Sequence, residues 1–278
     1  MNRYAYPHSW YWLAILSLFP FVYLSTLQWG YHRYTTVDTY YSHGFLIPFI
    51  TGFLIWQKRG TLKETPLSYS RFGLALIVFA LLLHLVSVIF YVFFTSGLSI
   101  LILVFGLSIF LFGWQRTKTI LFPLSFLVFM IPIPSSAINV ISLPLKMWVA
   151  YLGSTLVGIL DIPIHQSGFY IDTAKGVLLV DDPCSGIRSL ISFMALGALA
   201  GYISDSSMKS RSLLFALSIP IAMVTNILRV SFLIIISNYY GSGAAQPDTW
   251  AHDLSGYAAF AMGALLLFTT KRLLEWKK

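Results

Sequence analysis

Residues 72–94 read FGLALIVFALLLHLVSVIFYVFF, and this stretch decides the fold. It contains no Lys, Arg, Asp or Glu, and His84 is its one side chain that titrates near neutral pH. A helix of about 20 apolar residues crosses the hydrocarbon core of a bilayer. The stretch therefore predicts a membrane-spanning helix, in which we expect His84 to be a buried structural residue, hydrogen-bonded to a neighbouring helix.

The rest of the 278-residue chain has the same character. Hydrophobic residues make up 57% of it and charged residues only 10%, whereas soluble domains contain about 25% charged residues. We therefore predict an all-α membrane protein, a single polytopic domain over residues 1–278 with a bundle of about eight transmembrane helices. The predicted spans are 11–28, 40–57, 72–94, 97–114, 119–133, 186–203, 213–236 and 253–270.

One further apolar stretch, residues 137–160, is interrupted by Pro144, Lys146 and two glycines. It is either a ninth span or a helix lying in the membrane interface. Without it, and with a cytoplasmic N-terminus, most of the 18 basic residues fall in cytoplasmic segments, as the positive-inside rule requires. We therefore expect a multi-pass protein of the plasma (inner) membrane with both termini in the cytoplasm. The net charge of +8 then reflects membrane orientation, so we predict membrane lipids and no nucleic acid as partners.

The longest polar excursion, residues 161–183, falls on the extracytoplasmic side of this topology. Two apolar runs flank Ala174-Lys175-Gly176, and Gly168 lies earlier in the loop. Apolar runs separated by turn residues are typical of a β-hairpin. We therefore expect a short hairpin-like loop directly before the sixth span.

Four polar residues from separate spans are expected at the same outer level. Cys184 precedes the sixth span, His252 precedes the eighth, and His43 lies at the outer end of the second. Arg229 lies about 16 residues into the outward-running seventh span, so a rise of roughly 1.5 Å per residue puts it in the outer leaflet. A charge inside a span costs at least about 2.5 kcal/mol and therefore indicates a partner or a function.

A thiol, an imidazole and a guanidinium are the parts of a cysteine-nucleophile site. Cationic neighbours lower the pKa of a thiol, His moves protons, and a cation or donor holds the negative oxygen of a tetrahedral intermediate. Cys184, His252 and Arg229 fit these roles, and Asn226 lies on the same helical face as Arg229. Each residue also has an ordinary explanation. These are apolar packing for Cys184, an interfacial position for His252, an ion pair for Arg229 and an interhelical hydrogen bond for Asn226.

Other functions remain open at this point. Arg188 and Arg229 suit a transporter or lipid carrier that binds an anionic group, although Arg188 also suits a side chain that snorkels to the headgroups. The bundle alone would suffice for a non-catalytic sorting receptor that only holds a substrate helix. Zinc-ligand types occur without a close-spaced pair, so we predict no metal and no cofactor; their positions are His43, His165, His252 and Cys184.

Four motifs occur in a fixed order along the chain. They are Cys184-Ser185-Gly186-Ile187-Arg188-Ser189-Leu190, Asn226-Ile227-Leu228-Arg229 after Ile219-Pro220, His252 followed by Gly256, and Tyr41-Ser42-His43-Gly44 with Trp56 later. Over roughly residues 40–272 this set resembles the exosortase/archaeosortase family, the membrane-embedded counterpart of the soluble cysteine sortases. One departure is Pro183, where a small residue such as Ala is expected before the Cys.

The resemblance implies a cysteine transpeptidase or peptidase acting at the outer face of the membrane, toward the periplasm or exterior. Its partners would be exported substrate proteins with a C-terminal sorting signal made of a short Pro-containing motif, a transmembrane helix and a basic cluster. Cys184 would form an acyl-enzyme thioester, His252 would protonate the leaving amine, and Arg229 would stabilise the oxyanion or the thiolate. Supporting or substrate-binding roles would fall to Arg188, Asn226, His43 and Ser185.

Overall fold

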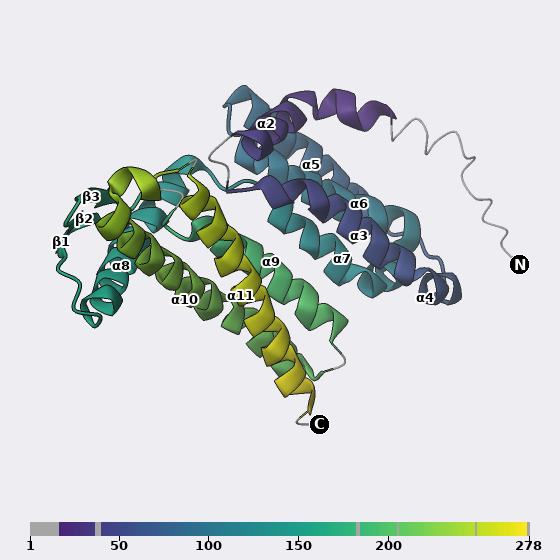
Figure 1. Cartoon of the computed structure of the whole chain (residues 1–278). Coiled ribbons are helices and arrows are strands. Elements are labelled where there is room, and N and C mark those ends of the chain that lie inside the picture. The colour runs from purple at the N-terminus through teal and green to yellow at the C-terminus, as the bar shows by residue number, and fades with distance from the viewer. Residues whose placement is uncertain (1–16, 37–39, 182–183, 205, 248, 277–278) are drawn as a thin grey trace, which may run out of the picture. The chain divides into compact units, whose positions relative to one another are not determined.

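The computed structural model describes residues 17–36, 40–181, 184–204, 206–247 and 249–276. These residues are mostly helical, at 80%, and they contain one three-stranded sheet. The chain divides into two compact units, Met1–Pro132 and Ile133–Lys278, whose elements are labelled in Figure 1. That residues 1–278 act as one polytopic domain stays a prediction.

The first unit is built from helices alone within its described residues. In chain order they are α2 (Leu24–Thr35), η1 (Ser42–Phe45), α3 (Leu46–Gln57), α4 (Arg59–Glu64), α5 (Arg71–Ile89), α6 (Phe93–Thr119), α7 (Leu121–Phe126) and η2 (Leu127–Met130). Residues 72–89 of the apolar stretch 72–94 form most of α5, and the stretch ends in the first residues of α6, on which α5 packs closely. A Cβ added to Gly73 would lie 2.3 Å from the backbone nitrogen of Phe110. Glycine is needed there because it lets two helix backbones approach each other.

A buried polar network joins α5 to α6 and to the chain before α2. His84 Nε2 lies 2.9 Å from the carbonyl oxygen of Val22, and His84 Nδ1 lies 2.8 Å from Ser96 Oγ. Because a carbonyl only accepts, Nε2 donates to Val22 and Nδ1 accepts from Ser96. The expectation that His84 is a buried residue hydrogen-bonded across helices is therefore confirmed.

The second unit contains the sheet and four long helices. Its elements are α8 (Ser135–Gly158), β1 (His165–Ser167), β2 (Tyr170–Thr173), β3 (Gly176–Leu179), α9 (Ile187–Ile203), α10 (Met208–Tyr240), η4 (Ser242–Ala245) and α11 (Trp250–Trp276). The strands are antiparallel in the order β1-β2-β3, with His165 opposite Asp172 and Ile171 opposite Leu178. The predicted turn at Ala174-Lys175-Gly176 joins β2 to β3. The loop therefore carries a second hairpin beyond the single one that we expected.

One face of the sheet is buried on α8 and α10. Ile171, Leu178 and Val180 belong to one apolar cluster with Val149 of α8 and Leu233 of α10. This cluster fixes the sheet on the two helices, since burying each such side chain contributes about 1.5–3 kcal/mol.

The turn between β2 and β3 is fastened to the C-terminal end of α10. The backbone nitrogen of Ala174 donates to Asn238 Oδ1 at 3.0 Å, and Lys175 Nζ donates to the carbonyl oxygen of Tyr239 at 2.5 Å. A cation at this position satisfies a terminal carbonyl and offsets the negative end of the helix dipole.

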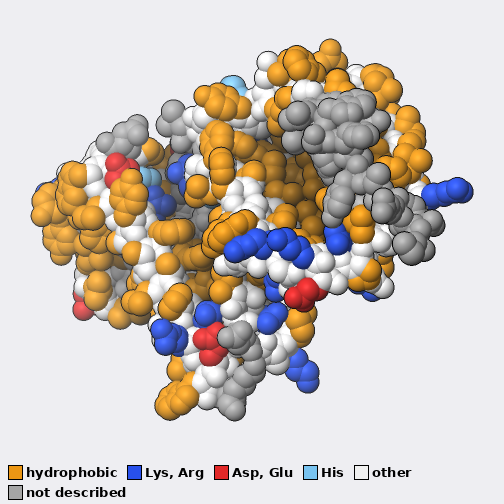
Figure 2. All heavy atoms as spheres, turned by 90° about the vertical axis from the view of Figure 1, so that its right-hand side faces the viewer, with side chains coloured by type: hydrophobic (Ala, Val, Ile, Leu, Met, Phe, Trp, Pro, Cys, Tyr) orange, Lys and Arg blue, Asp and Glu red, His pale blue; other side chains and the backbone are white. Residues whose placement is uncertain are grey.

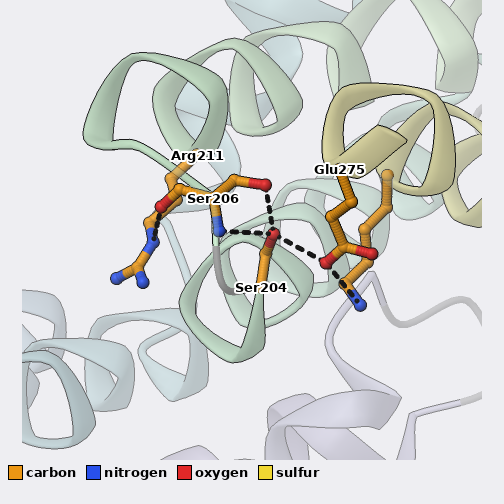
Figure 3. Close-up of polar contacts among 5 residues, drawn as sticks. Ser204, Ser206, Arg211 and Glu275 are labelled. Atoms are coloured by element: carbon orange, nitrogen blue, oxygen red, sulfur yellow. Dashed lines mark hydrogen bonds and ion pairs between the residues drawn. The ribbon is translucent and has the colours of Figure 1, made fainter. Parts of the chain in front are cut away.

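The opposite end of α10 carries a second set of polar contacts, drawn in Figure 3. Ser204, directly after α9, donates to Glu275 Oε1 of α11 at 2.9 Å. Glu275 also pairs with Lys271 at 3.1 Å. Arg211 of α10 donates from Nε to the carbonyl oxygen of Ser206 at 3.0 Å. These contacts tie the ends of α9 and α11 together beside the start of α10.

Within the described residues, five segments are long and apolar enough to cross a membrane. They are Arg71–Ile89, Phe93–Thr119, Ser135–Gly158, Met208–Tyr240 and Ser242–Trp276, the last of which contains both η4 and α11. Apolar side chains cover much of the surface seen in Figure 2, as a lipid solvent requires. Two of the expected spans form shorter apolar helices, Leu121–Met130 and Ile187–Ile203.

The stretch 137–160, which we did not count among the eight spans, lies in α8, one of the five long helices. Pro144 lies inside α8 without ending it. Residues 11–16 of the first expected span lie outside the described residues. The count of eight spans and the orientation of the termini stay predictions.

Candidate active site

Cys184 lies in the short connection between the sheet and α9. Its side chain is buried, with 7% of its surface exposed, and its backbone nitrogen donates to the carbonyl oxygen of Asp181 at 2.9 Å. Burial raises the pKa of the Cys184 thiol, and the positive charge of Arg229 opposes this rise. The thiol is therefore mainly protonated at neutral pH and needs a base before it can act as a nucleophile.

Asn226 of α10 holds the backbone of this connection. Its Nδ2 donates to the carbonyl oxygen of Cys184 at 2.9 Å, and its side chain is buried. Gly186 caps α9 with φ +83°, and a Cβ at Gly186 would lie 2.7 Å from Asn226 Nδ2. Glycine is required here both by the left-handed backbone and by the close approach of Asn226. Ser185 Oγ accepts a long hydrogen bond, 3.4 Å, from the backbone nitrogen of Ile187.

Arg229 of α10 and His252 of α11 are hydrogen-bonded to each other. Arg229 Nη2 lies 2.7 Å from His252 Nε2. A guanidinium can only donate, so Nε2 accepts and the imidazole is neutral with its proton on Nδ1. This Nδ1 is buried and makes no hydrogen bond within the described part of the chain, although the backbone of Ala245 lies beside it.

The start of α11 fixes the position of the imidazole. Thr249 directly precedes α11, and its Oγ1 accepts from the backbone nitrogen of His252 at 3.3 Å, in the manner of a helix N-cap. Ser255, one turn on, donates to the carbonyl oxygen of His252 at 2.8 Å and accepts from Arg229 Nε at 3.4 Å. Thr249 and Ser255 thus fix the backbone of His252, and Ser255 also binds the side chain of Arg229.

Cys184 and His252 both line one cavity of about 240 Å³ in the second unit. Small-molecule sites usually occupy roughly 300–1,000 Å³, so this cavity suits a side chain or a short peptide rather than a large cofactor. Its walls come from β3, α10 and the segment before α11: Val177, Leu178, Leu179, Val180, Asp181, Cys184, Val230, Leu233, Ser242, Ala245, Gln246, Pro247 and His252. The structure therefore brings together Cys184, Asn226, Arg229 and His252, which the sequence placed on three separate segments.

A comparison with protein families identifies the chain. The family model described as transmembrane exosortase matches residues 33–269. This chain belongs to the transmembrane exosortase family. The resemblance inferred from the ordered motifs is thus confirmed over most of the chain. No curated protein and no solved structure matches it.

The members of this family are membrane cysteine transpeptidases. Membership also indicates processing of proteins that carry sorting signals.

Two further charged residues lie around the site. Arg188, in the first turn of α9, is near enough for its charge to act on both Arg229 and His252. Its Nε is buried without a hydrogen-bond partner among the described residues. Lys146 of α8 acts electrostatically on Cys184. In the sequence Lys146 stands out only as an interruption of the apolar stretch 137–160. Its position in that stretch does not indicate that its charge acts on Cys184.

Two further histidines, His43 and His165, belong to the set that the sequence offered as possible zinc ligands. His43 lies in η1 of the first unit, where its ring is 5.9 Å from that of Tyr41. Its predicted supporting role stays a prediction. His165 is exposed on β1 and does not line the cavity. Among the described residues, no three His, Cys, Asp or Glu side chains are grouped so that they could hold a metal ion.

Proposed function

We propose that this protein cleaves exported proteins near a C-terminal sorting signal and transfers the product to an acceptor through a Cys184 thioester. The observation that supports the proposal best is the shared cavity: the thiol of Cys184 and the imidazole of His252 line it, and Arg229 is bonded to that imidazole. A nucleophile, a proton carrier and a cation are the groups that acyl transfer requires.

The reaction begins with a neutral thiol and a neutral imidazole. His252 takes the proton of Cys184, and the sulfur attacks the scissile carbonyl carbon. The carbonyl oxygen becomes negative in the tetrahedral intermediate, and Arg229 donates to it. The intermediate collapses as His252 gives the proton to the leaving amine, which breaks the C–N bond and leaves the thioester. An acceptor, either water or an amine, then attacks the thioester carbonyl with His252 as the base. Collapse of this second tetrahedral intermediate breaks the C–S bond, and His252 returns the proton to the sulfur of Cys184.

The hydrogen bond between Arg229 and His252 constrains this order of events. Nε2 of His252 is occupied by Arg229, so its lone pair is free to take a proton only when Arg229 moves its donor elsewhere. The substrate carbonyl oxygen is the group that draws it away. Substrate binding thus frees the base and positions the oxyanion donor in one movement.

Asn226 acts as a positioning residue in this scheme, because it holds the carbonyl oxygen of Cys184 and so fixes the direction of the thiol. The site faces the periplasm or exterior of a plasma (inner) membrane, and both termini lie on the cytoplasmic side of that membrane. The exported substrate places its own transmembrane tail beside the bundle, which raises the effective concentration of the scissile bond at the membrane surface.

The test uses a reporter with a soluble exported domain followed by a host-derived tail, which has a short Pro-containing motif, one apolar span and a basic cluster. Wild-type protein in native membranes should shorten this reporter and, with hydroxylamine present, release a hydroxamate from the thioester. Cys184→Ala and His252→Ala should abolish both products. His165→Ala is the matched control, because His165 is exposed and lies outside the cavity.

Normal processing by the Cys184→Ala protein at wild-type abundance would refute the proposal. A reporter that binds tightly but is never cleaved, with no adduct on Cys184, would indicate a sorting receptor instead.

A further inference from the structure

The outer edge of the sheet offers a binding surface for extended backbone beside the candidate active site. The strand order leaves β3 paired with β2 on one side only. The pairing Val180 N to Phe169 O, at 3.0 Å, fixes which residues of β3 face β2. Since backbone direction alternates along a strand, Leu178 and Val180 direct their N–H and C=O groups to β2. Val177 and Leu179 direct theirs away from it.

These outward groups form no hydrogen bond with any other residue in the described part of the chain. The side chains of Val177 and Leu179 are also exposed, at 53% and 42%. A strand edge with free backbone groups and apolar side chains is a template for pairing with another chain. Strand pairing of this kind is a recurrent way of recognising an extended peptide.

The free edge leads directly into the cavity that contains the thiol. Residues 177–181 line that cavity, and Cys184 and His252 line it as well. The remaining wall includes the apolar side chains Val230 and Leu233 of α10, followed by Ala245 and Pro247. An extended chain along β3 would alternate its side chains between the outer face and the interior.

We propose that β3 binds the segment of the substrate next to the scissile bond as an added strand, with one apolar side chain of that segment in the cavity. The occupant is an extended stretch of polypeptide, held through main-chain hydrogen bonds to Val177 and Leu179. This inference rests on the proposed function, and it assigns the part of the protein that presents the scissile carbonyl to Cys184.

Three features of the second unit support this assignment. The sheet is fixed on α8 and α10 through Ile171, Leu178 and Val180, so its edge is a rigid template. Lys175 and Asn238 fasten the turn before β3. The first residue of β3, Gly176, lies close to η4, because a Cβ there would be 2.8 Å from Ser242 Oγ. The edge is therefore closed at its start and open from Val177 onward, toward Cys184.

The decisive variant is Leu179→Pro. Proline removes the outward N–H of residue 179 without breaking a bond of the ladder between β2 and β3. Leu179→Ala keeps that N–H and removes only the side chain. Gln166→Pro is the matched control, because the register directs the N–H of Gln166 out of the other free edge of the sheet, on β1.

With the reporter described above, we expect Leu179→Pro to lower kcat/KM about tenfold or more, mainly through KM, since a lost pairing weakens binding. The kcat/KM of Leu179→Ala should fall less, and the kcat/KM of Gln166→Pro should match that of the wild type. Alkylation of Cys184 by iodoacetamide should be unchanged in all three variants, which shows that the thiol is still in place.

A second measurement reads binding without chemistry. Amide hydrogen exchange of the Cys184→Ala protein in nanodiscs should slow at Val177 and Leu179 when the tail-bearing reporter is added, but not when a tail-less reporter is added. Wild-type kcat/KM for Leu179→Pro, or no protection at these two amides while the wild type cleaves, would overturn strand addition and leave the proposed function standing. Protection at both amides without cleavage or adduct would support strand addition and overturn the catalytic proposal.

Discussion

Asn226 lies against Gly186 and binds the carbonyl oxygen of Cys184, an arrangement that we call the clamp. The structure allows its contribution to the free energy of unfolding to be worked out. The perturbation is Gly186→Ala, alone and combined with Asn226→Ala. Gly186 has φ +83°, and an L side chain in this region costs about 1–2 kcal/mol. The new methyl group would also lie 2.7 Å from Asn226 Nδ2, so Asn226 must move and release the carbonyl oxygen of Cys184.

Loss of that bond leaves a buried carbonyl without its partner, at a cost of about 1–3 kcal/mol. Gly186→Ala alone should therefore destabilise the protein by about 2–5 kcal/mol. In the Asn226→Ala background the nearest remaining atom of residue 226 is its Cβ, at 3.3 Å. Only the backbone strain then remains, about 1–2 kcal/mol. The two substitutions should be non-additive by about 1–3 kcal/mol, with the double variant more stable than the sum predicts.

The assay is reversible unfolding of the purified full-length protein in mixed micelles by increasing dodecyl sulfate, followed by tryptophan fluorescence. Gly158→Ala is the control, because a Cβ at this helical position of α8 meets no atom within 4 Å. It should change the free energy of unfolding by less than about 1 kcal/mol. Additivity of Gly186→Ala and Asn226→Ala within about 0.5 kcal/mol would refute the clamp, as would a Gly186→Ala variant as stable as Gly158→Ala.

Two further predictions concern titration and packing. Burial raises the pKa of Cys184, so the rate of its alkylation by iodoacetamide should reach half its maximum at a pH above the pKa of an exposed cysteine, which is about 8.5. Arg229→Gln should move this midpoint to a still higher pH. A midpoint below that of free cysteine would contradict the assignment. Substituting His84→Leu removes two buried hydrogen bonds and should lower the free energy of unfolding by about 1–2 kcal/mol; an unchanged unfolding curve would show that the network contributes nothing.

The helical, membrane-embedded class was predictable because the apolar stretches are long and nearly uncharged. The hairpin-like loop before α9 was also predictable, since turn residues separate its apolar runs. Its extra strand was not, because β1 has only three residues, His165–Ser167, too few for a pattern of period two. The behaviour of 137–160 was ambiguous for another reason: a proline inside a span predicts a break, but α8 continues through Pro144.

The grouping of Cys184, Arg229 and His252 could be predicted from depth in the expected topology, in which Cys184 and His252 precede inward-running spans and Arg229 lies in the outer half of an outward-running one. Their hydrogen bonds could not. Depth does not say that Arg229 donates to His252 Nε2, nor that Asn226 turns to the backbone of Cys184. Those choices depend on helix rotation and on the left-handed residue Gly186, which the sequence shows only as one glycine among 19.

The engagement of Arg229 with His252 explains why a buried thiol can be kept inactive until substrate arrives. Without substrate, His252 accepts from Arg229 and the thiol of Cys184 is protonated, so no thiolate is present to react with other carbonyl groups. The oxygen of a bound peptide carbonyl already draws the guanidinium away from His252, and this interaction strengthens as the oxygen gains negative charge. Arg229 therefore interacts more strongly with the transition state than with the ground state, and differential binding of this kind is what raises the rate of a chemical step. Strand addition along β3 would supply the remaining requirement by holding the carbonyl at the place where Arg229 can reach it.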